Sequence, residues 1–235
     1  LNAPHAVVSS VVIYMIRSLV GEDIPLNMGC LDPVDIILPA PSILNPTKGR
    51  AVAGGNVETS QRIADVLFGA LEKTAASQGT MNNVTFGNDT FGYYETIGGG
   101  AGASEGYNGV DAVHTHMTNT RITDPEILET RYPIRLTSFE IRDGSGGKGK
   151  WSGGNGIIRE YQFLTSLHVS ILTQRRVHPP YGMNGGEPAL SGENYRIFTS
   201  GSKQKLGSFA SYQADAGESL RICTPGGGGW GIYRK

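Results

Sequence analysis

Two histidines separated by a single residue are the most chemically suggestive feature of the sequence. His114 and His116 lie in the run VHTHMTNTR. In a β-strand, alternate side chains point to the same face, so both imidazoles would share one face with Thr118. Such a pair can relay protons or bind a metal ion, because imidazole titrates near neutral pH. A metal site normally needs at least three protein ligands, so Glu95, Asp111 or another chain would have to supply the third. We favour a substrate-facing role, with a structural pair as the alternative.

A carboxylate and two amides occur near the same runs. Tyr93 and Glu95 alternate in YYET, so strand geometry places them on one face. Glu95 could act as a general base or orient a histidine, or it could be an exposed strand acid. Asn83 and Asn119 offer amide donors and acceptors, although asparagine is also common in turns.

Two glycine-rich runs resemble nucleotide-binding loops but lack the required context. GGGAGA at residues 98–103 fits a loose dinucleotide pattern, yet the SEGYNG that follows is a poor helix start. GSGGKGKW at residues 144–151 resembles a phosphate loop, but Trp151 stands where a Ser or Thr would hold magnesium. We therefore predict simple turns at both places and no cofactor-binding residues in this chain.

The composition indicates a folded protein and excludes several classes. The 235 residues carry 20 Lys and Arg against 21 Asp and Glu, a formal net charge of −1. Such a chain lacks the basic field of nucleic-acid-binding proteins, and no apolar run reaches the roughly 20 residues of a membrane span. Two cysteines are too few for a disulfide framework, so a reducing, cytoplasmic compartment is expected. The 34 glycines predict many tight turns and close backbone approaches.

The elements that must position these residues fall into two groups. Apolar residues recur with helical spacing over residues 3–20 and 58–76, with a possible strand at 34–38 between them. After residue 77, strand-like runs dominate, interrupted by one helix that begins at Asp124 and ends before Pro133. The expected strands are 91–97, 110–117, 134–142, 156–164, 167–174, 194–199, 204–210 and 218–223. This pattern predicts an α+β fold: two early helices followed by a β-rich body, either a sandwich or a curved mixed sheet.

The ends of the chain carry further signals. Asn2 and Pro4 are typical of a helix start, and Gly21 of a helix end. Because a helix signal stands directly at Leu1, and the first residue is not Met, we expect a fragment of a longer protein. The TPGGGGWG run from Thr224 would be costly to order, yet it carries a tryptophan, so we expect it to pack against the body.

Six runs, taken in order, resemble the hydantoinase B/oxoprolinase family. They are GGNVETSQRIADVLFGAL from residue 54, ASQGTMNNVTFGN from 76, YYETIGGGAGA from 93, VHTHMTNTRITDPEILETRYP from 113, PPYGMNGGEP from 179 and TPGGGGWG from 224. The resemblance covers nearly the whole chain. It implies that the chain is the C-terminal part of a hydantoinase B-like half, with residues 1–78 as its helical part and residues 79–235 as the β-rich part of the same domain.

The resemblance also implies a reaction. Within the family, the runs look closest to enzymes of glutathione metabolism that open 5-oxo-L-proline to L-glutamate while ATP is cleaved to ADP and phosphate, with magnesium and potassium. An N-methylhydantoinase-type cyclic amide hydrolase subunit, or a non-catalytic structural module of such an enzyme, is the alternative. ATP and Mg would bind to a hydantoinase A-like half outside this chain, and a divalent metal could bind in the preceding part of the B-like half. This chain alone is not expected to be active.

The resemblance implies partners and a reaction chamber as well. The partners would be the remainder of the same enzyme, a small-molecule substrate and further copies in a homo-oligomer, but neither nucleic acid nor a membrane. The metal ligands remain unknown, because no run matches the family's metal motifs. We chose the chamber residues by chemistry and by their location in the matching runs: His114, His116 and Glu95 as catalytic residues, and Asn83, Asn119 and Tyr93 as substrate-binding residues.

Overall fold

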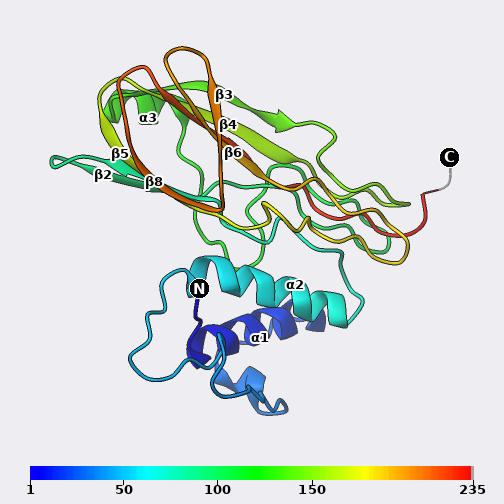
Figure 1. The fold of residues 1–235 in the computed structure, drawn as a ribbon. Coiled ribbons are helices and arrows are strands. Elements are labelled where there is room, and N and C mark those ends of the chain that lie inside the picture. The colour runs from blue at the N-terminus through cyan, green and yellow to red at the C-terminus, as the bar shows by residue number, and fades with distance from the viewer. Residues whose placement is uncertain (234–235) are drawn as a thin grey trace.

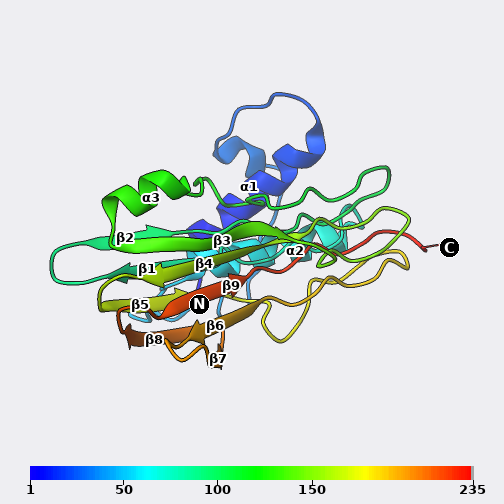
Figure 2. The same ribbon diagram turned by 90° about the horizontal axis from the view of Figure 1, so that it is seen from above.

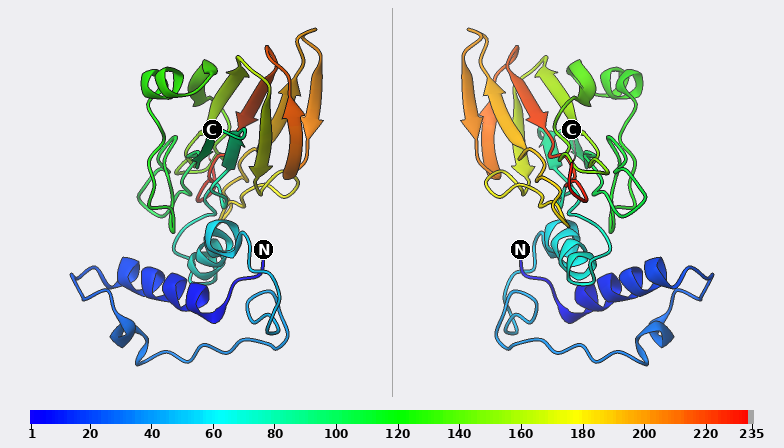
Figure 3. Two further views of the ribbon diagram at one scale, coloured as in Figure 1. Left: turned by 90° about the vertical axis from the view of Figure 1, so that its left-hand side faces the viewer. Right: turned by 90° about the vertical axis from the view of Figure 1, so that its right-hand side faces the viewer.

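The computed structural model describes residues 1–233 and shows two helices packed beneath a β-rich part, as expected for an α+β fold (Figure 1). The helices are α1 (His5–Val20), α2 (Ser60–Ala70) and α3 (Pro125–Arg131). Figure 3 shows α2 lying between α1 and the β-rich part. Residues 234 and 235 of the expected β-rich part lie outside the described residues.

The β-rich part is a sandwich of two antiparallel sheets, so the mixed-sheet alternative is wrong. One sheet has the order β2-β1-β5-β8 and the other the order β3-β4-β9-β6-β7. The strands are β1 (Asn83–Gly87), β2 (Gly92–Glu95), β3 (Ile134–Arg142), β4 (Gly156–Phe163), β5 (Leu167–Leu172), β6 (Glu193–Ile197), β7 (Lys203–Leu206), β8 (Phe209–Ala214) and β9 (Ser219–Cys223). Figure 2 shows the strands of both sheets running in similar directions.

One apolar core fills the space between the sheets. Val84 and Phe86 of β1 face Tyr161 and Phe163 of β4, and all four side chains are almost completely buried. The alternation of buried and exposed residues along β2 and β5 is the period-two pattern expected of strands with one face on a core. The core therefore fixes which face each strand turns inward.

Several predicted strands differ from the observed ones. Residues 34–38 form no strand, and Ile37 is 89% exposed. Residues 110–117 form only a single bridge, because Ala112 and His116 adopt positive φ angles of 52° and 48°, which interrupt an extended chain. The predicted strand 204–210 is split into β7 and β8, and β1 was not foreseen.

The helix predictions hold with shifted boundaries. Gly21 ends α1 in the left-handed conformation, and the Asp124 side chain caps α3 by accepting from the Glu126 and Ile127 amides. Pro4, not Asn2, occupies the N-cap of α1. The second helix starts as a π-helical turn at Gly55–Thr59 and ends at Ala70, six residues earlier than predicted.

Extended glycine-rich segments continue from one end of the sandwich. We call residues 98–103, 109–112, 145–156, 181–187 and 225–231 the glycine bundle. Successive amides of the last segment bond to different neighbours: Gly227 to the Gly154 carbonyl, Gly228 to that of Ala76 and Gly229 to that of Glu187, at 2.8–3.0 Å. Figure 2 shows these chains running side by side toward the C-terminus. The predicted packing of the TPGGGGWG run is confirmed, since Trp230 is 4% exposed.

Only glycine fits where these chains meet. A Cβ on Gly228 would lie 1.9 Å from the Tyr181 carbonyl oxygen, and one on Gly153 would lie 1.8 Å from that of Gly227. Such distances are far below van der Waals contact, so the abundance of glycine reflects backbone-to-backbone packing. None of the helices in residues 1–233 has both the length and the apolar character needed to cross a membrane.

Candidate functional site

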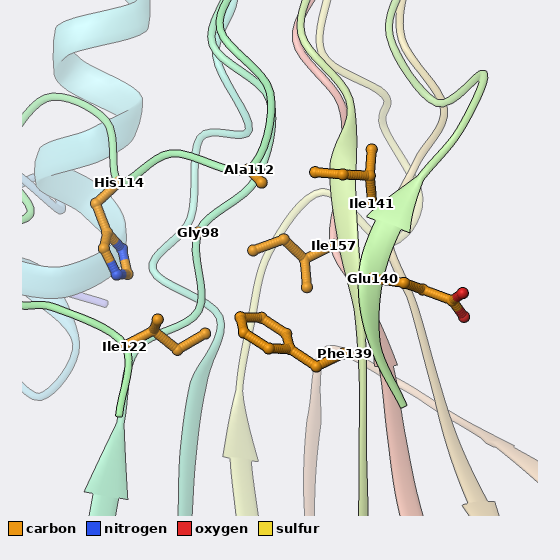
Figure 4. Close-up of a pocket in the computed structure, with 8 residues that line it drawn as sticks. All are labelled: Gly98, Ala112, His114, Ile122, Phe139, Glu140, Ile141 and Ile157. Carbon is orange, nitrogen blue, oxygen red and sulfur yellow. The ribbon is translucent and has the colours of Figure 1, made fainter. Parts of the chain in front are cut away.

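A cavity beside His114 lies where the glycine bundle meets strands β3 and β4 of the sandwich (Figure 4). It has a volume of about 280 Å³ and a largely apolar lining. The other lining side chains are those of Ile122, Phe139, Ile141, Ile157 and Glu140, whose carboxylate points away from the cavity in Figure 4, and Gly98 and Ala112 contribute backbone and a methyl group. An apolar cavity with one polar group able to do chemistry is the usual form of a small-molecule site.

His114 is the half-buried group of this cavity that can move a proton, since the other titratable lining residue, Glu140, is exposed. Within residues 1–233, neither of its ring nitrogens has a hydrogen-bond partner, although both are buried. Burial lowers the pKa of His114, and the negative charge of Glu95 opposes this shift only in part. The imidazole is therefore neutral at pH 7. A neutral imidazole offers one nitrogen that accepts a proton and one that donates a hydrogen bond.

Glu95 lies inside the sandwich and not on its surface. Arg159 of β4 donates to both carboxylate oxygens, from Nε to Oε2 at 3.0 Å and from Nη2 to Oε1 at 3.1 Å. The Thr123 amide and the Tyr161 hydroxyl also donate to this carboxylate. The side chain of Glu95 is 1% exposed, so its hydrogen-bonding capacity is used within the core. This arrangement favours a structural role over general-base catalysis.

Tyr93 shares the buried face of β2 with Glu95, as the alternation predicted. Its ring packs against Phe86 with centroids 4.7 Å apart, and its hydroxyl donates to Thr123 Oγ1 at 2.8 Å. Burial raises the pKa of Tyr93, and the nearby Glu95 charge raises it further. Tyr93 is therefore a neutral core residue with a satisfied hydroxyl.

His116 lies apart from His114 because this stretch is not a strand: His116 has a positive φ of 48° and begins a turn. Its Nε2 is 3.3 Å from Asp65 Oδ1, and its Nδ1 is 3.3 Å from the Tyr14 hydroxyl. The ring also stacks on Phe68 of α2, with centroids 5.5 Å apart. The two histidines thus contact different surroundings, and the expectation of one shared face is wrong.

The two predicted amides also have different surroundings. Asn83 is buried, and its Nδ2 donates to Glu58 Oε1 and to the Leu172 carbonyl, both at 2.7 Å. Its Oδ1 accepts from the Tyr94 hydroxyl at 2.6 Å. Asn119 is exposed. The structure therefore groups Asn83 with Glu58, and places Asn119 outside that group.

Sequence reasoning missed a layer of buried polar residues on the face of α2 and its preceding turn that contacts the β-rich part. Asp65 is its centre: Oδ1 accepts from the Ser77 amide and hydroxyl at 2.9 Å, and Oδ2 accepts from Arg175 Nη2 at 2.8 Å. Helical periodicity showed the apolar stripe of α2 but did not show what covers its opposite, polar face. We call Glu58, Asp65, Ser77, Asn83, His116 and Arg175 the polar junction.

Glu58 is the titratable group of the polar junction with the most unusual environment. It lies in the π-helical turn, a feature that often marks functional positions. Its Oε1 accepts from the Met81 amide and Asn83, while Oε2 has no partner among the residues described. Burial raises the pKa of Glu58 to about 7, because desolvation outweighs its hydrogen bonds and the Arg176 charge.

The glycine-rich loops do not fit a nucleotide. A phosphate cradle needs free backbone amides. The amides of Gly99, Gly100 and Ala101 instead bond to the carbonyls of Val113, Pro225 and Val110. Gly146 and Gly147 donate to Asn155 Oδ1 and to the Gly227 carbonyl. We therefore assign no ATP site to these loops. No group of three or more His, Cys, Asp or Glu side chains within residues 1–233 is arranged to hold a metal ion.

Two known proteins are similar in sequence to nearly the whole of this chain. It is 56% identical over 230 residues to 5-oxoprolinase 1 of Arabidopsis thaliana and 50% identical over 253 residues to 5-oxoprolinase of Saccharomyces cerevisiae. It covers only 18% and 20% of these proteins, respectively.

Comparison of structures adds the fold. The ATP-dependent caprolactamase of Pseudomonas jessenii superposes with a TM-score of 0.79 at 21% identity, over 94% of this chain and 42% of that one.

The model of the hydantoinase B/oxoprolinase family matches residues 1–232. The chain therefore belongs to the hydantoinase B/oxoprolinase family.

Proposed function

We propose that this chain is part of an ATP-dependent 5-oxoprolinase, which hydrolyses 5-oxo-L-proline to L-glutamate as ATP is cleaved to ADP and phosphate. The observation that carries the proposal is its identity of 50–56% with proteins named 5-oxoprolinase, over 98% or more of the chain. Because the chain spans about a fifth of those relatives, the reaction belongs to the complete enzyme. We assign ATP and Mg to the remainder, and the enzyme to the cytoplasm and glutathione metabolism.

The role that we propose for this chain is to supply one wall of the ring-opening chamber. Opening a lactam requires a bond from water oxygen to the carbonyl carbon, cleavage of the C–N bond and a proton for the departing nitrogen. His114 is suited to carry that proton, because its imidazole is neutral and its nitrogens have no partner within the described chain. Two of its apolar walls, Phe139 and Ile141, are 44% and 41% exposed in this chain, so the remainder of the enzyme would have to cover them to limit access of bulk water.

The test uses the complete enzyme and separates its two reactions. In His114→Ala, we expect glutamate formation from 5-oxo-L-proline to fall at least a hundredfold, the scale of a lost general acid or base, while ATP hydrolysis falls less. His168→Ala is the matched control, because His168 is exposed on β5 and its ring bonds to Ser211 alone among the residues described. Equal loss of both reactions in His114→Ala, together with a lower melting temperature, would instead indicate a structural module.

Substrate profiling tests the reaction itself. We expect ATP-dependent product formation from 5-oxo-L-proline and not from hydantoin, N-methylhydantoin or caprolactam. Preferential opening of a hydantoin would replace the proposed activity with the hydantoinase alternative. Turnover of 5-oxo-L-proline without ATP would contradict the proposed coupling.

A further inference from the structure

A second hollow, which shares no lining residue with the His114 cavity, is bordered by three arginines. Arg62 comes from α2, and Arg175 and Arg176 come from the chain that follows β5. Gln174 and His178 also line the hollow, which has a volume of about 240 Å³. This size is just below the range of about 300–1,000 Å³ for drug-sized ligands, so it suits a small metabolite.

The three guanidinium groups contact only one carboxylate within residues 1–233. Asp65 Oδ2 accepts from Arg175 at 2.8 Å and lies 3.9 Å from Arg62 Nη1. In the described part of the chain, Arg176 bonds only to neutral oxygens, those of Asn82, Asn194 and the Gln174 backbone. Burial lowers the pKa of Arg176 to about 9, so its guanidinium remains charged at neutral pH, and the nearby Glu58, with a pKa of about 7, is only partly ionised there. The hollow therefore carries a net positive charge.

Two of the guanidinium donors also lack an acceptor. Arg62 Nη1 and Arg175 Nε are buried, and neither has a hydrogen-bond partner within residues 1–233. Gly79 lies beside them: a Cβ there would stand 2.7 Å from Asp65 Oδ2, 2.8 Å from Arg175 Nε and 3.1 Å from Arg62 Nη1. The absence of a side chain at position 79 thus allows the two guanidinium groups to share the single carboxylate of Asp65. That carboxylate compensates one of the two positive charges, and a second anion would compensate the other.

We propose that this hollow binds the carboxylate of a small molecule, and that in the complete enzyme this is the carboxylate which 5-oxo-L-proline and L-glutamate share. The second clause rests on the proposed function. Guanidinium groups match a carboxylate in geometry and charge. Arg62 is the arginine available for it, since its side chain is 37% exposed and its one ionic neighbour is 3.9 Å away. Because the hollow and the His114 cavity share no lining residue, the carboxylate would be captured here separately from ring opening beside His114.

The experiment measures binding by calorimetry to the complete enzyme, to Arg62→Ala and to the control Arg135→Ala, whose arginine is exposed on β3. The probes are 5-oxo-L-proline, L-glutamate, succinate, 2-pyrrolidinone and inorganic phosphate. We expect the two amino-acid-derived carboxylates to bind the enzyme and the control equally, and to bind Arg62→Ala at least tenfold more weakly. 2-Pyrrolidinone has the same ring without the carboxylate, and its binding should not change.

The probes separate this inference from the proposed function. If the enzyme fails to open 5-oxo-L-proline but still binds succinate in an Arg62-dependent way, the carboxylate site stands and the proposed activity falls. If ring opening is found and Arg62→Ala leaves the KM for 5-oxo-L-proline unchanged, the site is wrong. Arg62-dependent binding of phosphate alone would also overturn the carboxylate assignment. Binding of none of the probes, with a lower melting temperature of Arg62→Ala, would show that the enzyme's own residues occupy the hollow.

Discussion

Glu95 of β2 and Arg159 of β4 form a buried ion pair that joins the two sheets of the sandwich. The Arg159 Nε to Glu95 Oε2 distance is 3.0 Å, and neither side chain is more than 1% exposed. The pair contacts Tyr161 and the backbone of Thr123, so the charge of the carboxylate is compensated on several sides. Glu95 therefore links the sheets from within the core.

Replacing Glu95 should destabilise the fold more than it alters the chemistry. Glu95→Ala leaves the Arg159 charge buried without its partner, which typically costs about 3–5 kcal/mol. Urea unfolding should show this loss of stability. The control is Glu140→Ala, which removes an exposed acid on β3 and should change the free energy of unfolding only slightly. An enzyme that kept its stability in Glu95→Gln but lost ring opening would support the catalytic role that the sequence suggested.

Because Glu58 is protonated in the folded protein at weakly acidic pH, the free energy of unfolding should decrease as the pH rises and this proton is lost. Its pKa is about 7 in the folded protein, against 4.5 for an unperturbed glutamate. Between these values the folded state holds a proton that the unfolded chain releases, so the free energy of unfolding decreases by up to about 1.4 kcal/mol per pH unit. The contribution is fully present below pH 4.5 and is lost above about pH 7.

Glu58→Gln should remove this slope. Denaturant unfolding at pH values from 5 to 8 measures it, and the slope is the diagnostic quantity because the new amide also changes the hydrogen bond to Asn83. Glu140→Gln serves as a control that keeps the slope. The same pH dependence in wild type and Glu58→Gln would contradict a raised pKa at this position.

His116 and His114 should respond differently to replacement. His116→Ala removes a ring stacked on Phe68 and one of several groups around Asp65. Asp65 keeps its bonds to Ser77 and Arg175, so we expect a loss of about 1–3 kcal/mol in stability. Ring opening and ATP hydrolysis should fall in proportion to the folded fraction. A selective loss of ring opening at full stability would place His116 in the chamber, as the sequence first suggested.

The sequence predicted the elements with a strong period and missed those defined by contacts across the chain. β3 begins and ends where its alternating pattern predicted, and Asp124 caps α3 because capping is a local interaction. The segment that holds His114 failed as a strand because two residues with positive φ break it, and such conformations depend on the surrounding glycine bundle.

The candidate site could be predicted only in part for a related reason. His114 was identified by its chemistry alone, whereas its cavity is formed by residues from distant strands. The buried polar face of α2 was missed, since periodicity cannot show that a second layer, including Arg175, covers it. Arg62 was passed over because a single arginine on a helix carries no signal until its neighbours are known.

The glycine bundle provides the last prediction, which tests whether its close packing is essential. Gly228→Ala would place a Cβ 1.9 Å from the Tyr181 carbonyl oxygen, a contact that only movement of two backbones can relieve. We expect a loss of more than about 3 kcal/mol or no folded protein, because overpacking at a rigid site exceeds the usual range of 1–3 kcal/mol. The matched control is Gly92→Ala, where no described atom lies within 4 Å of the new Cβ and φ is not positive. Melting temperature and soluble yield measure both variants. Equal stability of the two would show that the segments can separate, and the bundle could not then hold His114 and the sandwich in a fixed relation.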